Sequence, residues 1–212
     1  MPVETAVARQ TQAAVDATAL SCAPDVVLEQ ALVNEVIDGD TIEVVLNGQT
    51  LRVRYIGIDT PERDEYFYHQ ATLANQSFVA GKTVMLFKDV SDTDRYGRLL
   101  RYVFVDTIFV NYELVRQGYA LASTYPPDVA CAEVFAEAQH LARSEQAGFW
   151  SPLNLTGRFE NTSNCHPSYP TVCIAASPPD LDCKDVPHRN FIVLGEDPHR
   201  FDGDNDGIGC EK

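Results

Sequence analysis

The chain has 212 residues, of which 45% are hydrophobic, enough to build a core in one ordinary domain plus a smaller one. Its 16 Lys and Arg stand against 31 Asp and Glu, which gives a formal net charge of -15. This balance argues against a protein that holds a polyanion through many basic contacts, because such a surface would repel phosphates at long range. Acidic proteins that act on phosphates usually need bound cations, so the composition favours metal-dependent chemistry.

The six cysteines form an even set without a Cys-x-x-Cys pair, and only five His are present to share a zinc site. Disulfides are therefore favoured over zinc, and they imply an oxidising compartment. Among the many possible connectivities we favour Cys165–Cys173 and Cys183–Cys210, which leaves Cys22–Cys131.

The N-terminus does not resemble a signal peptide, because it lacks a basic start and Asp16 interrupts any apolar core. No run approaches the roughly 18 apolar residues of a membrane span. We therefore expect a secreted or extracytoplasmic protein whose export signal is absent from this chain.

In chain order, residues 1–31 have apolar residues too loosely spaced for a helix, and we interpret them as an N-terminal extension. From Leu32 the apolar residues alternate, which predicts strands over 33–37, 41–46 and 51–58. Asn47-Gly48 between two such runs predicts a tight hairpin turn. Three consecutive antiparallel strands are expected.

Helical spacing predicts helices over 66–80, 111–117 and 130–145, the first two ended by glycine. Two further strands are expected over 84–90 and 99–105, separated by a polar loop at 91–98. Five short strands interleaved with helices predict an α+β fold with a small closed β-barrel. The residues expected to face the core are Ala71, Ala74, Phe78 and Val79 in the first helix and Val134, Phe135, Ala138, Leu141 and Ala142 in the last.

The pair Phe149-Trp150 ends this domain, which we assign to residues 32–152. The composition then shifts to Ser, Pro, Asn and Thr, so residues 153–179 are expected to form a linker that a Cys165–Cys173 disulfide would hold as a loop. Residues 180–212 are too few to build a core unaided.

Two acidic clusters, Asp38-Gly39-Asp40-Thr41 and Asp59-Thr60-Pro61-Glu62, carry the chemistry. The strands around Gly39 would bring Asp40 beside the end of the third strand, where Asp40, Asp59 and the Thr60 carbonyl could share one hard cation. Taken singly, Asp38-Gly39 could be an ordinary turn, Arg54 a surface residue, and Glu62 an acid favoured by a helix N-terminus. Their combination favours a metal and phosphate site.

These clusters, together with Arg54, the loop Asp94-Arg95-Tyr96-Gly97-Arg98 and the segment 111–118, closely resemble the thermonuclease (staphylococcal nuclease-like) family over about residues 33–151. The resemblance implies a five-stranded OB-fold barrel with about three helices, and hydrolysis of phosphodiester bonds in DNA and RNA with calcium. The roles it implies are metal ligands for Asp40, Asp59 and Thr60, general base for Glu62, phosphate clamps for Arg54 and Arg98, and nucleotide contacts for Tyr96 and Tyr125.

Some of these roles stay open. Glu62 could take the proton from the attacking water or only orient that water. Tyr96 and Tyr125 could stack on bases or bind phosphate, or they could pack on the barrel rim. Irregular carboxylate sites favour calcium over magnesium. Manganese is an alternative to calcium. Residues 63–66 are acidic where the family's type member has a lysine-rich loop, which predicts weaker substrate capture.

The C-terminal segment 202–207 places acids at positions 1, 3 and 5 and glycine at position 6, as in the first half of an EF-hand loop. With Cys183 and Cys210 around it, this segment resembles the Excalibur calcium-binding domain of extracellular bacterial proteins. A solvated acidic tail is the alternative. The second calcium site implied by the resemblance consists of Asp202, Asp204, Asp206, Ile208 and Glu211.

The sequence thus predicts an exported bacterial nuclease that depends on calcium and acts on DNA and RNA with little sugar specificity. Two alternatives belong to other classes: a binding module that uses the barrel only as a scaffold, and a calcium-dependent extracellular surface protein. No obligate protein partner is implied.

Overall fold

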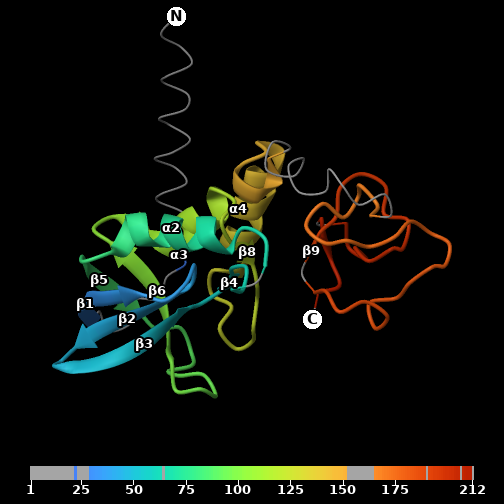
Figure 1. Ribbon diagram of the computed structural model, residues 1–212. Coiled ribbons are helices and arrows are strands. Elements are labelled where there is room, and N and C mark those ends of the chain that lie inside the picture. The colour runs from blue at the N-terminus through green and yellow to red at the C-terminus, as the bar shows by residue number, and fades with distance from the viewer. Residues whose placement is uncertain are drawn as a thin grey trace, which may run out of the picture. The chain divides into compact units, whose positions relative to one another are not determined.

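The computed structural model describes Cys22 and residues 29–63, 65–151, 165–189, 191–205 and 207–211. The chain divides into two compact units, with the boundary between Gly148 and Phe149. The first unit combines a β-barrel with three helices, and the second consists mainly of loops (Figure 1). None of the helices in the described ranges has the length and apolar character needed to cross a membrane.

The first three strands of the barrel form the predicted antiparallel meander. They are β1 (Glu29–Val36), β2 (Thr41–Leu46) and β3 (Gln49–Tyr55). Asn47 and Gly48 both have positive φ, 51° and 80°, and Leu46 pairs with Gln49. This is the two-residue turn whose twist matches that of the flanking strands.

Closure of the barrel brings β3 beside a strand that lies far from it in the sequence. Strand β5 (Thr83–Phe87) pairs antiparallel with β1, and β6 (Leu99–Val105) pairs antiparallel with β5. A parallel pairing between β3 and β6, with Arg54 opposite Leu100, closes the ring. The predicted five-stranded closed barrel is therefore confirmed, and its closure lays the 91–98 loop next to the strand that carries Arg54.

Three very short strands were not predicted as separate elements. The third predicted strand, 51–58, ends at Tyr55, and Ile58 begins a strand of its own. Strand β7 (Ile108–Phe109) extends the sheet beyond β6, while β4 (Ile58–Asp59) and β8 (Leu121–Ala122) form a separate two-stranded ribbon. A two-residue strand is too short to show alternation in the sequence. The β4–β8 ribbon fixes the backbone of Asp59, which pairs with Leu121.

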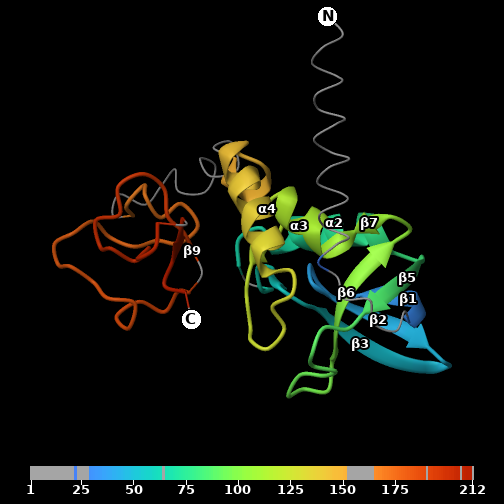
Figure 2. The same ribbon diagram turned by 180° about the vertical axis from the view of Figure 1, so that it is seen from behind.

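Helix α2 (Tyr68–Val79) lies across the barrel, and α3 (Val110–Arg116) and α4 (Ala132–Ser144) pack beside each other near β6 (Figures 1 and 2). Their bounds agree with the expected helices to within two residues at each end. The core of this unit contains buried residues of the barrel interior, including Ile42, Val44, Val53, Leu86 and Val103, and of the helices, including Ala71, Val79, Phe135 and Ala138.

All three predicted disulfides are confirmed: Cys22–Cys131, Cys165–Cys173 and Cys183–Cys210. The first ties the segment before the barrel to the residue that precedes α4. Strand β1 starts at Glu29, so the last residues of the expected N-terminal extension belong to the barrel. Apart from Cys22, the rest of that extension lies outside the described residues.

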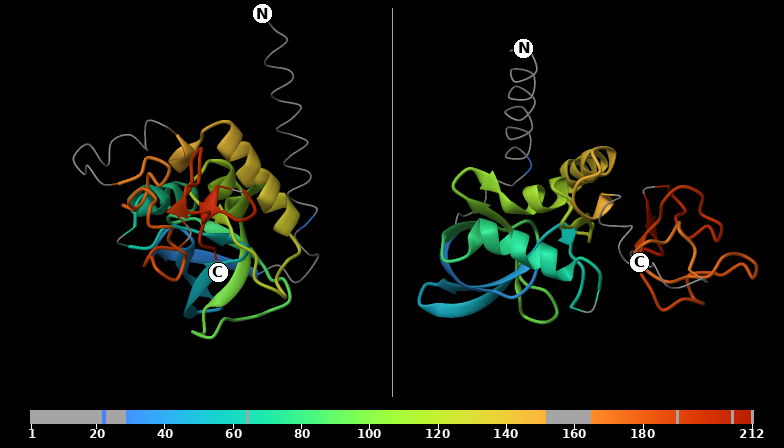
Figure 3. Two further views of the ribbon diagram at one scale, coloured as in Figure 1. Left: turned by 90° about the vertical axis from the view of Figure 1, so that its right-hand side faces the viewer. Right: turned by 45° about the horizontal axis from the view of Figure 1, so that its top comes forward.

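The second unit, whose chain is coloured orange to red in Figure 3, has few regular elements. It has its own small core, arranged around Tyr169. Tyr169 and Ile174, which fall in the expected linker, are buried with Phe191 and Phe201 from the C-terminal stretch. Strands β9 (Phe191–Ile192) and β10 (Ile208–Gly209) form a short antiparallel pair. Residues 165–175 thus contribute to this core rather than only leading to it.

Candidate active site

The site begins where the turn between β1 and β2 approaches Thr60. Gly39 lies so close to Thr60 that a Cβ atom on it would be 2.7 Å from the threonine hydroxyl oxygen. This contact places the buried Asp40 carboxylate against Thr60: Asp40 Oδ2 accepts hydrogen bonds from the Thr60 amide at 2.9 Å and hydroxyl at 2.8 Å. The two acidic clusters identified in the sequence therefore meet in space, as the strand arrangement predicts.

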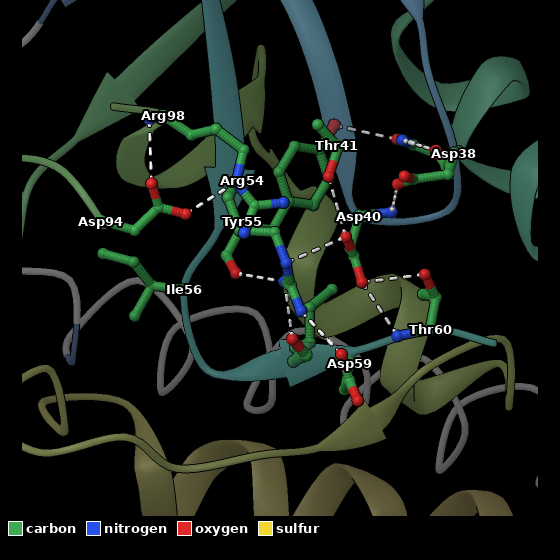
Figure 4. Close-up of polar contacts among 12 residues, drawn as sticks. Asp38, Asp40, Thr41, Arg54, Tyr55, Ile56, Asp59, Thr60, Asp94 and Arg98 are labelled. Carbon is green, nitrogen blue, oxygen red and sulfur yellow. Dashed lines mark hydrogen bonds and ion pairs between the residues drawn. The ribbon is translucent and has the colours of Figure 1, made fainter. Parts of the chain in front are cut away.

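Arg54 joins Asp40 to Asp59 (Figure 4). Its Nε lies 3.1 Å from Asp40 Oδ1, and its Nη2 donates to Asp59 Oδ1 at 2.7 Å. Its Nη1 donates to the carbonyls of Tyr55 and Ile58, both at 2.8 Å. The guanidinium is thus fixed between two carboxylates and the chain turn that connects β3 to β4, with its side chain only 14% exposed.

The site carries more negative charge than Arg54 balances. The pKa of Asp59 is raised from 3.8 to about 6, first of all by burial; Arg54 lowers it, and the carboxylates of Asp40, Glu62 and Glu65 raise it. The pKa of Asp38 is likewise raised to about 6, first by burial and then by Asp40. A bound cation would stabilise the charged forms of both groups.

Two fully buried asparagines hold the backbone of the site, and sequence reasoning did not identify their role. Asn75 in α2 donates to the Asp38 carbonyl at 2.9 Å and accepts from the Tyr55 hydroxyl at 2.9 Å. Asn111 in α3 donates to the Ile56 carbonyl and accepts from the Val103 amide, both at 2.9 Å. The only signal in the sequence was an amide side chain among apolar helix positions.

Arg98 and Tyr96 lie together on the 91–98 loop. Asp94 accepts hydrogen bonds from the backbone amides of Tyr96 and Arg98, and its Oδ2 lies 2.6 Å from Arg98 Nε. These hydrogen bonds lower the pKa of Asp94 although its burial acts to raise it. The Tyr96 ring, 68% exposed, has the Arg95 guanidinium 4.7 Å and that of Arg98 5.6 Å from its centroid.

Glu62 and Tyr125 are also exposed. Glu62 follows Asp59 and Thr60 in an exposed turn, where its amide donates to Glu65 Oε2 and its carbonyl accepts from the Glu65 amide, each at 2.8 Å. It is near enough to Asp59 to raise the pKa of that carboxyl. Tyr125 is 57% exposed on the loop before α4 and pairs through its backbone with Asp128.

In the second unit the acidic segment forms a closed turn. Asp202 Oδ2 accepts from the Gly207 amide at 2.9 Å, and the Asp202 amide donates to Asp197 Oδ2 at 2.8 Å. Asp206, one of the five expected ligands, lies outside the described residues. Within the described ranges, no three His, Cys, Asp or Glu residues come together as a metal-binding group in either unit.

Sequence similarity to known proteins places the chain in a family. The sequence profile described as "Staphylococcal nuclease homologue" matches residues 52–152. A thermonuclease from Staphylococcus intermedius is 36% identical over 132 residues, which cover 59% of this chain and 79% of that protein. The chain belongs to the staphylococcal nuclease homologue family. The part matched includes Arg54, Asp59, Glu62 and Arg98.

Two relatives from Bacillus subtilis (strain 168) carry the name endonuclease. The endonuclease YncB is 34% identical over 132 residues, which cover 58% of this chain and 63% of the relative. The SPbeta prophage-derived endonuclease YokF is 36% identical over 135 residues, which cover 60% of this chain and 44% of the relative. The chain thus spans less than two thirds of either relative. The names of these staphylococcal nuclease homologues support a nuclease function.

Proposed function

We propose that this chain is a calcium-dependent nuclease that hydrolyses the phosphodiester bonds of DNA and RNA with little sugar specificity. The observation that carries the proposal is the joining of Asp40 and Asp59 by Arg54, with the Asp40 carboxylate hydrogen-bonded to Thr60 and Glu62 two residues further along. Residues that could bind a cation, bind a phosphate and act as a base therefore come together from the β1–β2 turn, strand β3 and the segment 59–62.

The donor set fits calcium. The ligands would be the carboxylates of Asp40 and Asp59 and the Thr60 carbonyl, all of them oxygens, as a hard cation requires. The raised pKa of Asp59 supports this assignment, because burial disfavours its charged form and a bound cation would offset that cost. Bound there, calcium would polarise a phosphoryl oxygen and offset the charge of the approaching substrate.

The remaining chemistry falls to side chains of this chain. Arg54 and Arg98 would donate hydrogen bonds to phosphate oxygens and neutralise the charge that grows there in the transition state. Glu62 would accept a proton from the attacking water or hold that water in place. Tyr96 and Tyr125, both exposed, would contact the nucleotide by stacking or hydrogen bonding.

A second calcium ion would bind in the second unit through Asp202, Asp204, Asp206, Ile208 and Glu211. The turn that Asp202 closes with Gly207 supports this proposal. Titration calorimetry should then count two ions per chain. Asp204→Asn should lose one ion while keeping cleavage, and an unchanged ion count in this variant would contradict the assignment.

The three disulfides support a secreted or extracytoplasmic location. The direct test of the function is a cleavage assay on DNA and on RNA of matched sequence, in calcium, in excess chelator, and after calcium is restored. We expect cleavage of both substrates in calcium and none in chelator. A chain that cleaves neither substrate with any divalent ion would instead support a binding or surface role.

A further inference from the structure

The structure assigns Arg101 as a positioning residue that holds the 91–98 loop, and with it Arg98 and Tyr96, through Asp92. Within the described residues, none of the hydrogen bonds or ion pairs of Arg101 is made with Arg98 or Tyr96, so its role would be indirect. The inference rests on the proposed nuclease function for its effect on activity, but the contacts themselves can be tested without it.

Arg101 is a charged residue inside the end of the barrel. It lies two residues before the buried Val103 on β6 and pairs with the buried Tyr55 on β3, so its side chain lies on the same interior face as theirs. Only 3% of the residue is exposed. Its Nε donates at 2.8 Å to Glu29, which shares the interior face of β1 with Ala31. A buried guanidinium is retained only where its N–H groups find partners.

Apart from the Leu100 carbonyl in β6, which accepts from Nη1 at 2.8 Å, the remaining partner of Arg101 is Asp92 at the base of the loop. Its Nη2 donates to Asp92 Oδ1 at 2.9 Å and its Nη1 to the Asp92 carbonyl at 3.0 Å. The same carbonyl accepts from the Leu100 amide at 2.9 Å. Asp92 is therefore bound at its side chain and its backbone by a residue that cannot move without opening the barrel end.

A second contact fixes the same end of the loop. The buried Asp128 accepts at Oδ1 from the amides of Val90 at 3.0 Å and Ser91 at 2.7 Å. Beyond residues 90–92 the loop is held by its own hydrogen bonds to Asp94. Arg101 and Asp128 thus both hold the N-terminal end of the loop, at residues 90–92, and its other end leads directly into β6. Together they determine where Arg98 and Tyr96 lie relative to Arg54.

The test compares three variants at a temperature where all remain folded by circular dichroism. Arg101→Met removes both loop contacts, Asp92→Ala removes one, and Glu29→Ala removes the Arg101 partner that lies on β1 and not on the loop. We expect kcat to fall about 10-fold to 100-fold in Arg101→Met, because a displacement of about 1 Å at a catalytic group has effects of this size. The kcat of Asp92→Ala should fall by less, and that of Glu29→Ala should stay within about two-fold of the wild-type value.

Limited trypsin digestion gives a readout that does not depend on activity. Cleavage after Arg95 and Arg98, measured by mass spectrometry on the folded chain, should accelerate about 10-fold or more in Arg101→Met and stay near the wild-type rate in Glu29→Ala. If the kcat and the digestion rate of all three variants equalled those of the wild type, the inference would be overturned. A wild type that cleaves no nucleic acid would contradict the proposed function, and digestion alone would then decide whether Arg101 holds the loop.

Discussion

At the scale of single residues, the site is a balance of charge. Asp38, Asp40 and Asp59 lie close to one guanidinium, that of Arg54, and the pKa values of Asp38 and Asp59 are both raised to about 6. Burial, together with the neighbouring carboxylates, disfavours the ionised forms of Asp38 and Asp59. A bound cation would offset this cost.

This balance predicts an unusual pH dependence of stability. Because the folded-state pKa of Asp59 is raised above 3.8, its contribution is fully present below that value and is lost as pH rises through about 6. In excess chelator, the Tm of the wild type should therefore decline relative to Asp59→Asn between about pH 4 and about pH 7. Added calcium should reduce this decline. Parallel pH profiles of the two proteins in chelator would contradict the prediction.

A second prediction at this scale concerns the arginines of the loop. Arg98→Ala should lower kcat by roughly 10²-fold or more if its guanidinium stabilises the transition state. Arg95→Ala is the matched control, because Arg95 lies over the same Tyr96 ring but has no assigned role in catalysis. Equal losses in the two variants would mean that the loop acts only through its general positive charge.

At the scale of elements, the site depends on helices that hold loops by single amide side chains. Asn111 in α3 joins the backbone of residue 56 to that of residue 103, and Asn75 in α2 joins the backbone of Asp38 to the Tyr55 hydroxyl. Both side chains are fully buried. An unpaired backbone group at either place would be desolvated without compensation.

Asn111→Ala should therefore lower the free energy of unfolding by about 2–4 kcal/mol, since it leaves one carbonyl and one amide unsatisfied. The matched control is Asn34→Ala, which removes an exposed hydrogen bond to Glu43 and should change the free energy by less than about 0.5 kcal/mol. Urea unfolding measures both. Equal, small effects would show that water replaces the lost contacts in Asn111→Ala.

The elements also show what the sequence could and could not predict. The alternation in β1 to β3 and the Asn47-Gly48 turn are local signals, and both led to correct strands. The ribbon between Ile58 and Ala122 has no local signal, because each strand has two residues and depends on the fold around it. The meeting of Asp40 with Thr60 was predictable from the motifs, whereas the contact of Arg101 with Glu29 joins residues 72 positions apart and was not.

At the scale of the whole molecule, the cross-links act on separate units. Cys22–Cys131 closes a loop with a sequence separation of 109 in the first unit, and Cys165–Cys173 and Cys183–Cys210 lie in the second. Long loops gain the most from closure, because the unfolded chain loses more conformational freedom.

Replacing Cys22 and Cys131 together by Ala should lower the free energy of unfolding of the first unit by about 2–5 kcal/mol. The matched control replaces Cys165 and Cys173 by Ala, a pair in the second unit, and should leave the unfolding transition of the first unit unchanged. Urea unfolding monitored by nucleic-acid cleavage after dilution would follow the first unit. An equal shift in both variants would show that the two units unfold together.

The net charge of -15 makes the cation central to how the whole protein meets an anionic substrate. The most direct measurement is a calcium titration of the cleavage rate in the wild type and in Asp59→Asn, whose amide can keep the single hydrogen bond from Arg54. We predict that the wild type is inactive without calcium and saturates, and that the variant needs roughly 10²-fold more calcium or stays inactive. Superimposable titration curves, or full cleavage in excess chelator, would contradict the account.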